Sequence, residues 1–260
     1  MRTTLALAGL ALVAASGSPA APAQAAETCQ EKLVTISDPD GGTVDGTDGD
    51  DVILVGPDVT VNAGAGHDTV CVQGSEDADY VDIRDAEDLD VRLGGGYDTL
   101  NLYRGGAGVG EIDGGADSAT VMLVPDRSVA VDLAERTMSM DADSSYRFTG
   151  FDTVLASAKR VRLVGRSGPD HLRALAQSCH VAIDGGRGRD WLAVAPNTVD
   201  APPVTCAYRT SAVLRGQAGN DLMVGFRGND HLLGGPGRDT AKGGFGRDTC
   251  RAEVERACER

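Results

Sequence analysis

Residues 216–250 repeat one nine-residue phrase four times without an insertion. The copies begin at Gly216, Gly225, Gly234 and Gly243, and they read GQAGNDLMV, GFRGNDHLL, GGPGRDTAK and GGFGRDTC. Three columns of the phrase do not vary: glycine fills the first and fourth positions, and aspartate fills the sixth. A fixed short period of this kind predicts a solenoid, in which each repeat stacks on its neighbours.

The stretch resembles the RTX, or hemolysin-type, calcium-binding nonapeptide, G-G-x-G-x-D-x-U-x with U apolar. The resemblance implies Ca²⁺ as the cofactor and a parallel β-roll in which two nonapeptides form one coil. Calcium takes six to eight oxygens, more than one turn can offer, so two turns must share each ion. We therefore expect at least two ions here. The implied metal residues are Gly216, Gly219, Asp221, Gly225, Gly228, Asp230, Gly234, Gly237, Asp239, Gly243, Gly246 and Asp248.

Like turns of such a roll stack every eighteen residues. Asp221 should therefore face Asp239 on one edge, and Asp230 should face Asp248 on the other. The apolar eighth position should point into the core. In the four copies it is filled by Met223, Leu232, Ala241 and Cys250.

Looser copies of the phrase occur earlier in the chain. Their aspartates are further candidate calcium ligands, namely Asp51, Asp68, Asp98, Asp152, Asp170 and Asp190. Asp152, Asp170 and Asp190 follow one another at intervals close to one coil. These intervals predict a calcium-type turn on only one edge of each coil in the body, with both edges used only in the last two coils.

The predicted fold class is all-β, a parallel β-roll or β-helix solenoid with a disulfide-closed C-terminal cap. We expect a signal peptide at 1–25, a degenerate solenoid body at 26–210, four tandem nonapeptides at 211–250 and a cap, a small disulfide loop or a helix, at 251–260. Residues 101–149 are the least readable part. Within them, Val121–Val124 and Val129–Leu133 could be strands, and Ala134–Ser145 a short helix or loop.

The N-terminus has the features of a cleavable secretory signal. Arg2 precedes an apolar run from Leu5 to Ala15, and small residues around Ala25 provide a cleavage site. We therefore expect a secreted, extracellular protein. No later apolar stretch is long enough to span a bilayer, so we expect no membrane insertion.

Six cysteines lie beyond the predicted cleavage site, and an even number in an exported chain indicates disulfides. Fifteen pairings are possible. Pairing sequence neighbours is the simplest hypothesis, and it joins Cys29 to Cys71, Cys179 to Cys206, and Cys250 to Cys258.

The composition limits the partners of the chain. Asp and Glu number 39 against 24 Lys and Arg, which gives a net charge of −15 and makes nucleic acid an unfavourable partner. Because many of the aspartates recur in register with glycines, we interpret them as ligands rather than as a solvated surface. We expect a monomer that binds calcium ions, and a protein or polysaccharide partner stays open.

The sequence contains no His-Glu-x-x-His, Gly-x-Ser-x-Gly or P-loop motif, so we expect no enzyme. The function favoured is a secreted protein whose solenoid is folded and stabilised by calcium. The alternatives are a β-helix lyase or hydrolase acting on an extracellular polysaccharide, and a cell-surface adhesion module. We interpret Trp191, at a seventh repeat position, as a surface or inter-coil packing residue rather than a sugar platform.

Overall fold

The computed structural model describes residues 28–73, 78–103, 108–115, 118–125, 127–141, 144–175, 178–196 and 211–259. The predicted signal peptide and its cleavage site near Ala25 lie outside these residues. The described part of the chain consists of strands and turns, without a helix, and so offers no helical segment that could cross a membrane. The all-β prediction is confirmed.

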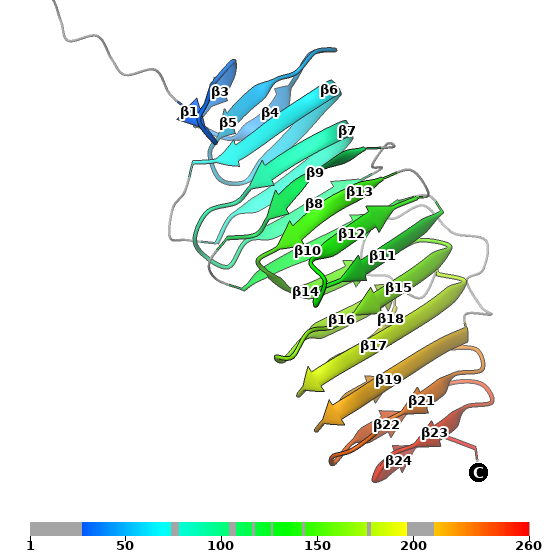
Figure 1. The fold of residues 1–260 in the computed structure, drawn as a ribbon. Coiled ribbons are helices and arrows are strands. Elements are labelled where there is room, and N and C mark those ends of the chain that lie inside the picture. Colours follow the sequence, from blue (N-terminus) through cyan, green and yellow to red (C-terminus); the bar gives the residue numbers. More distant parts are fainter. Residues whose placement is uncertain are drawn as a thin grey trace, which may run out of the picture.

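The strands wind into a flattened solenoid with two long faces of parallel strands, called face A and face B here (Figure 1). Face A contains β4 (Gly42–Asp45), the first halves of β6 (Val59–Val72) and β7 (Tyr80–Arg92), β8 (Thr99–Tyr103), β10 (Ala119–Val124), β14 (Phe151–Ala156), β16 (His171–Leu175), β18 (Trp191–Ala195), β20 (Leu222–Val224), β22 (Thr240–Lys242) and β24 (Val254–Arg256). Face B contains β3 (Ile36–Asp38), β5 (Val52–Val55), the second halves of β6 and β7, β9 (Val109–Asp113), β13 (Ser145–Thr149), β12 (Thr137–Met140), β11 (Ser128–Asp132), β15 (Arg160–Val164), β17 (His180–Gly188), β19 (Ser211–Gly219), β21 (His231–Leu233) and β23 (Thr249–Arg251).

The C-terminal coils have the eighteen-residue stacking that the repeat predicts. On face A, β20 pairs in parallel with β22, and Leu222 lies opposite Thr240. On face B, β21 pairs in parallel with β23, and His231 lies opposite Thr249.

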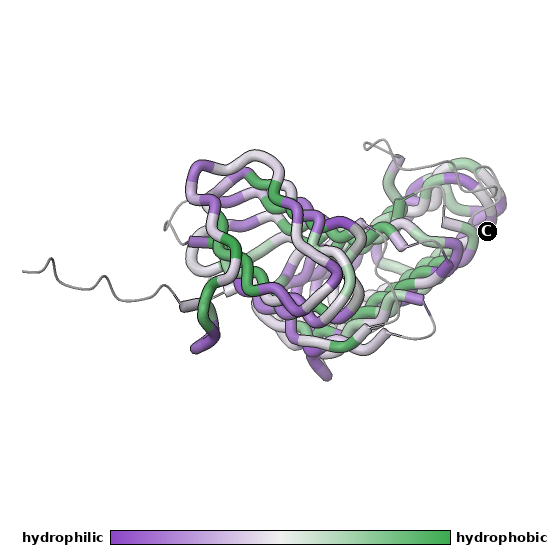
Figure 2. Tube along the Cα trace, turned by 90° about the horizontal axis from the view of Figure 1, so that it is seen from above, coloured by the Kyte–Doolittle hydropathy of each residue, from purple (hydrophilic) through white to green (hydrophobic). Residues whose placement is uncertain are grey.

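The core is a set of apolar columns between the two faces, because alternate residues of a strand point to opposite sides. The eighth-position residues Met223, Leu232 and Ala241 are fully buried, and Cys250 packs against the same core. Seen along the stack, the polar and apolar segments alternate around each coil, and the N-terminal coils are offset from the C-terminal ones (Figure 2).

The middle of the chain departs from simple coiling. β10 and β11 confirm the two strands expected there, but the helix or loop expected over Ala134–Ser145 is wrong, because this segment contains β12. β12 pairs antiparallel with β11 and with β13, and this meander is inserted into face B between β9 and β15. Met138 and Met140 alternate with polar residues along β12, so the extra strand buries side chains in the common core.

The N-terminal end is held by a short hairpin on the outside of face B. β1 (Thr28–Cys29) pairs antiparallel with β2 (Lys32–Leu33), and a disulfide joins Cys29 to Cys71 as predicted. Cys29, Leu54 and Cys71 form a small buried cluster of their own. The hairpin therefore covers outward-pointing residues of β5 and β6.

The C-terminal cap is closed by the predicted disulfide between Cys250 and Cys258. The helix considered for this cap is wrong, because Val254–Arg256 forms β24 and extends face A by pairing with β22. Cys179 is also disulfide-bonded. Its predicted partner Cys206 lies outside the described residues, so that pairing stays a prediction.

Candidate calcium sites

The motif aspartates form buried ladders along the edges of the solenoid. Most of them end a turn and immediately precede a strand, whereas Asp68 lies within β6 and Asp152 within β14. Exposure of the motif aspartates is 6% for Asp51 and at most 2% for Asp68, Asp98, Asp170, Asp190, Asp221, Asp230, Asp239 and Asp248.

Hydrogen bonds join the rungs of these ladders. The backbone N–H of Asp221 donates to the Oδ1 atom of Asp239 at 2.9 Å, and Asp230 donates in the same way to Asp248 at 2.9 Å. The facing pairs that the eighteen-residue period predicts are therefore confirmed. The same bond joins Asp51 to Asp68, Asp79 to Asp98, Asp170 to Asp190, and Asp190 to Asp221.

The ladders lie on two edges. Edge A holds the turns that lead into face A, and edge B holds those that lead into face B. Asp51 and Asp68 lie on edge B, whereas Asp98 lies on edge A, so the motif changes edges within the body. Asp79, which the sequence analysis missed, stands above Asp98 and is also buried. The sequence indicates Asp79 only by its position, directly before a strand and about one coil ahead of Asp98.

The first-position glycines leave room for these carboxylates. A Cβ added to Gly216 would lie 2.4 Å from Oδ2 of Asp221 and 2.7 Å from the carbonyl oxygen of Gly234 in the next coil. A Cβ on Gly225 would meet Asp230 and the carbonyl of Gly243 in the same way. Thus a carboxylate oxygen and a carbonyl oxygen from two successive turns meet above each of these glycines.

The fourth-position glycines allow successive turns to touch. Gly237 has φ of +149°, a conformation that residues with a side chain rarely adopt, and a Cβ there would lie 1.5 Å from the carbonyl oxygen of Gly219. Gly246 is placed in the same way beneath Gly228. These carbonyls therefore point from one turn into the space shared with the next.

The turns are of two kinds, which differ in whether another turn of the same edge stands above them. The turns 46–51, 165–170 and 225–230 each stand first in a stack and are called head turns. In them the N–H of the second residue (Thr47, Arg166 or Phe226) donates to Oδ2 of the aspartate of the same turn at 2.7 to 3.3 Å.

The following turns are 63–68, 185–190, 216–221, 234–239 and 243–248. Their second residue has a positive φ, between +72° and +106°. In four of the five turns this residue is glycine, and a Cβ there would meet the carbonyl of the turn above. In this conformation the N–H no longer reaches the carboxylate. As a result, one buried oxygen has no hydrogen-bond partner in Asp68, Asp190, Asp221, Asp239 and Asp248.

These buried oxygens provide a test of whether calcium fits. A buried carboxylate oxygen without a partner is costly, and a cation removes that cost. The described residues hold no cluster of three or more metal-ligating side chains, so most of the oxygens for an ion must be backbone carbonyls. A donor set of carboxylates and carbonyls, without nitrogen or sulfur, is the set that calcium prefers. The turns therefore fit Ca²⁺.

Burial makes the ladder carboxylates resist ionisation. It raises the pKa of Asp190 to about 7, and the neighbouring carboxylates of Asp221 and Asp170 add to the rise. Burial likewise raises the pKa of Asp68 to about 6 and that of Asp230 to about 6. Each stacked pair thus places unfavourable negative charge where a cation would be stabilised.

The edge A ladder has a different group at each end. At the top, the Arg166 guanidinium lies 3.0 Å from Asp170 and 3.9 Å from Asp152. Asp152 itself is only half-buried and accepts the hydroxyl of the adjacent Thr153 at 3.1 Å rather than a ladder N–H, so we assign no calcium site to it. At the bottom, Glu253 accepts the N–H of Asp239 at 2.7 Å and so takes the place of the next aspartate.

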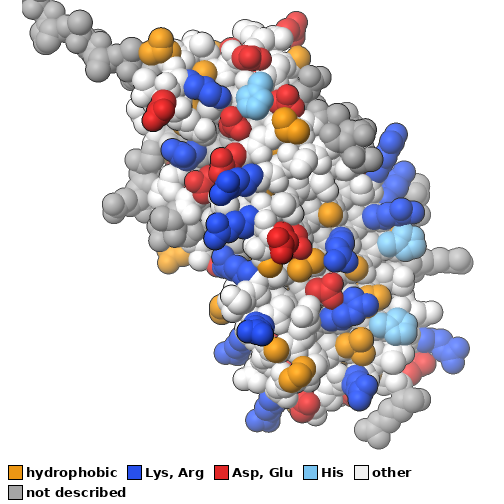
Figure 3. Space-filling view, viewed as in Figure 1, with side chains coloured by type: hydrophobic (Ala, Val, Ile, Leu, Met, Phe, Trp, Pro, Cys, Tyr) orange, Lys and Arg blue, Asp and Glu red, His pale blue; other side chains and the backbone are white. Residues whose placement is uncertain are grey.

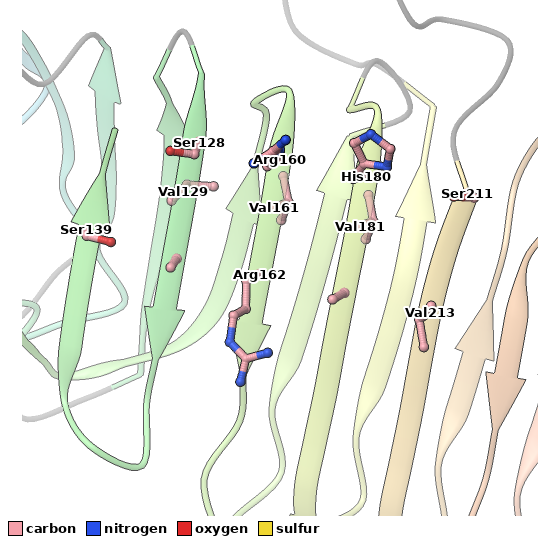
Figure 4. Close-up of a pocket in the computed structure, with 12 residues that line it drawn as sticks. Ser128, Val129, Ser139, Arg160, Val161, Arg162, His180, Val181, Ser211 and Val213 are labelled. Carbon is pink, nitrogen blue, oxygen red and sulfur yellow. The ribbon is translucent and has the colours of Figure 1, made fainter. Parts of the chain in front are cut away.

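The outer surface carries a different charge from the edges. In the lower part of Figure 3, over the C-terminal coils, Lys, Arg and His side chains predominate over Asp and Glu. Some line a hollow of about 360 Å³ on the outside of face B, where Arg160, Arg162 and His180 project from neighbouring strands (Figure 4). Parts of the exterior are therefore basic, although the chain as a whole is acidic.

Comparison with known proteins locates a family match in the C-terminal coils. The family model of the RTX calcium-binding nonapeptide repeat, in four copies, matches residues 212–241 and 224–253. No curated protein matches the chain. Together with the parallel stacking of β19 to β24, the match identifies residues 212–253 as RTX calcium-binding nonapeptide repeats that form a β-roll.

Proposed function

We propose that this is a secreted, non-enzymatic calcium-binding protein, in which Ca²⁺ held between stacked turns folds and stabilises the solenoid. The observation that carries the proposal is the set of buried carboxylate oxygens without partners, of which those of Asp190 and Asp221 lie beside a carbonyl of the next coil. Without a cation, each of these oxygens destabilises the folded chain.

Five spaces between fully described turns could each hold one ion. They lie between 46–51 and 63–68, 165–170 and 185–190, 185–190 and 216–221, 216–221 and 234–239, and 225–230 and 243–248. In each space the ligands would come from both turns, namely the two aspartates and the carbonyls of the first, second and fourth positions. Asp98, which stacks with Asp79, is a further candidate.

The chemistry that calcium supplies is the neutralisation of paired carboxylates and the joining of two successive turns. The residues of the chain supply the rest. The ladder hydrogen bonds fix each carboxylate, and glycines at the first and fourth positions let the turns approach closely. Because several ions would be stacked along one edge, the C-terminal coils should depend on calcium more than the body does.

Two features support secretion. The disulfides Cys29–Cys71 and Cys250–Cys258 are of a kind that persists in oxidising compartments outside the cytoplasm. The sequence of residues 1–25 has the pattern of a signal peptide. Free calcium is also abundant outside cells, where modules of this kind bind it at about 0.1 to 1 mM.

The test is a calorimetric titration of the mature protein with calcium, with far-UV circular dichroism and hydrogen exchange recorded alongside. We expect several sites, a gain of β signal, and protection of residues 211–250 that disappears in chelator. Absence of calcium binding would overturn the proposal. Equal protection with and without chelator would show that calcium does not fold these coils.

A further inference from the structure

A hollow of about 740 Å³ lies on edge A, beside the outer side of face A and away from the hollow of Figure 4. Its walls are two columns of variable repeat positions. The fifth positions contribute Arg189, Asn220 and Arg238, and the seventh positions contribute His171 and Trp191. None of these five side chains takes part in the carboxylate ladder.

Two cations of this hollow are available to a ligand. Arg189 and Arg238 are exposed, and neither makes an ion pair among the described residues. The acidic residues beside them, Asp190 and Asp221, are buried in the ladder and accept backbone N–H groups. The guanidinium groups are therefore the charged groups that the hollow presents to solvent.

The spacing of these cations is set by the coils. Arg189 and Asn220 stand at equivalent positions of successive coils, and Asn220 accepts the backbone N–H of Arg238 in the following coil at 2.9 Å. Strands of neighbouring coils are about 4.8 Å apart, so the two arginines stand roughly 10 Å apart along the stack. This is about the length of a disaccharide.

Beside Arg189, at one end of this row, lies a rigid aromatic surface. Trp191 is 37% exposed, although its ring is held by residues of the preceding coil. The ring meets His171 edge-on, with 5.7 Å between ring centroids, and the Arg173 guanidinium lies 5.2 Å from its centroid. This contact confirms the inter-coil packing expected of Trp191. It also fixes the part of the ring that faces the hollow.

We propose that this hollow binds an acidic polysaccharide that carries a carboxylate on every second sugar and runs along the stack. The Trp191 ring offers an apolar face for a sugar ring, and Arg189 and Arg238 offer charge-assisted hydrogen bonds to two carboxylates. Asn220 adds a polar group between the two arginines, and His171 adds one in the coil that precedes Trp191. This binding goes beyond the calcium-dependent folding proposed above.

Aromatic residues with arginines are also typical of sites for single-stranded nucleic acid. The charge of the chain distinguishes the two. A nucleic acid carries one negative charge per nucleotide, and a protein of net charge −15 repels such a strand. A chain with one charge per disaccharide meets less repulsion and matches the spacing of the two arginines.

Trp191 is the only tryptophan of the chain, so its fluorescence reports directly on this hollow. The probe is a hyaluronan hexasaccharide, titrated in buffer that contains calcium, with the neutral chitohexaose as the matched control. We expect the acidic hexasaccharide to change the fluorescence saturably and the neutral one to bind at least tenfold more weakly, the effect of roughly one charged hydrogen bond.

Variants localise the binding. Arg189→Ala and Arg238→Ala should each weaken binding about tenfold. Arg187→Ala, which removes the same charge from an exposed position of the same turn outside the hollow, should leave it unchanged. Circular dichroism of each variant checks that the fold is retained.

Three results would overturn the proposal. Equal binding of the neutral hexasaccharide would show that the arginines do not recognise carboxylates. Weaker binding by Arg162→Ala, on face B, but not by Arg189→Ala would move the site to the hollow of Figure 4. Tighter binding of a single-stranded oligonucleotide of equal length would make nucleic acid the ligand.

Discussion

The position of Asp221 in its ladder predicts that one substitution at this residue removes two calcium ions. It is joined by hydrogen bonds to Asp190 above and to Asp239 below, so its carboxylate borders two inter-turn spaces. Asp248 is joined to Asp230 alone and borders only one. Asp→Asn retains an oxygen that can accept the ladder N–H, but it replaces a charged ligand oxygen with an amide nitrogen, which repels a cation.

The magnitude follows from linkage. At free calcium tenfold above the dissociation constant, one site adds about 1.4 kcal/mol to the free energy of unfolding. Asp221→Asn should therefore remove about 2.8 kcal/mol of the stabilisation that calcium provides, and Asp248→Asn about half of that. Calorimetric stoichiometry should fall by two ions in the first variant and by one in the second.

Urea unfolding followed by circular dichroism, with calcium and with chelator, separates this effect from general destabilisation. In chelator the two variants should differ little from each other, because both keep the ladder hydrogen bond. If both variants lose the same number of ions, the sharing of Asp221 between two sites is wrong. If Asp221→Asn loses none, its carboxylate is not a ligand.

Three further predictions concern the turns and the cap. Gly237→Ala should destabilise the protein by more than about 3 kcal/mol in urea unfolding, because its Cβ would meet a carbonyl oxygen at 1.5 Å. The control is Gly168→Ala, whose Cβ would have its nearest neighbour at 3.8 Å. It should change the free energy of unfolding by less than about 0.5 kcal/mol. Burial raises the pKa of Asp190 to about 7, so the folded metal-free protein binds a proton that the unfolded chain releases. The stability that this proton contributes is fully present below about pH 4 and is lost as pH rises through about 7. Asp190→Asn should therefore flatten this part of the pH profile of stability measured in chelator. Replacing Cys250 and Cys258 by serine should lower the free energy of unfolding by about 2 to 3 kcal/mol, because the disulfide no longer closes a short loop in the unfolded chain. Hydrogen exchange should increase first in the last coil. Unchanged exchange there would show that the disulfide does not hold the cap.

The period of the sequence was sufficient to predict the stacking of the C-terminal coils. A nine-residue repeat with an apolar eighth position leaves little freedom, because each strand must place Met223, Leu232 or Ala241 in the core. Two of the disulfides could also be predicted. Each joins sequence neighbours that the coil geometry brings together.

The meander in the middle could not be predicted, because it follows no repeat. β12 is short and amphipathic, and its two buried methionines would fit either a helix or a strand. What decides its conformation is its position between β11 and β13, which satisfy its backbone hydrogen bonds. The meander in turn depends on the more distant strands β9 and β15, which pair with β13 and β11.

The two kinds of turn were also hidden in the sequence. Gly165-Arg-Ser-Gly168-Pro-Asp170 and Gly216-Gln-Ala-Gly219-Asn-Asp221 have the same fixed residues, yet the first is a head turn and the second a following turn. The difference depends on whether another turn of the same edge stands directly above. In the second case the second residue has a positive φ, even where that residue is Gln217.

The net charge of the chain averages over a separation within the repeat, because the sixth-position carboxylates and the fifth-position arginines occupy different places in it. The sixth-position aspartates are buried and face each other, whereas the variable fifth position holds arginines such as Arg189 and Arg238 that point outward. Five calcium ions would raise the net charge from −15 to about −5 and would neutralise mainly the buried acids. Calcium would thus do more than join the coils. It would leave the exposed arginines as the dominant charges along edge A, where an acidic polysaccharide is proposed to bind.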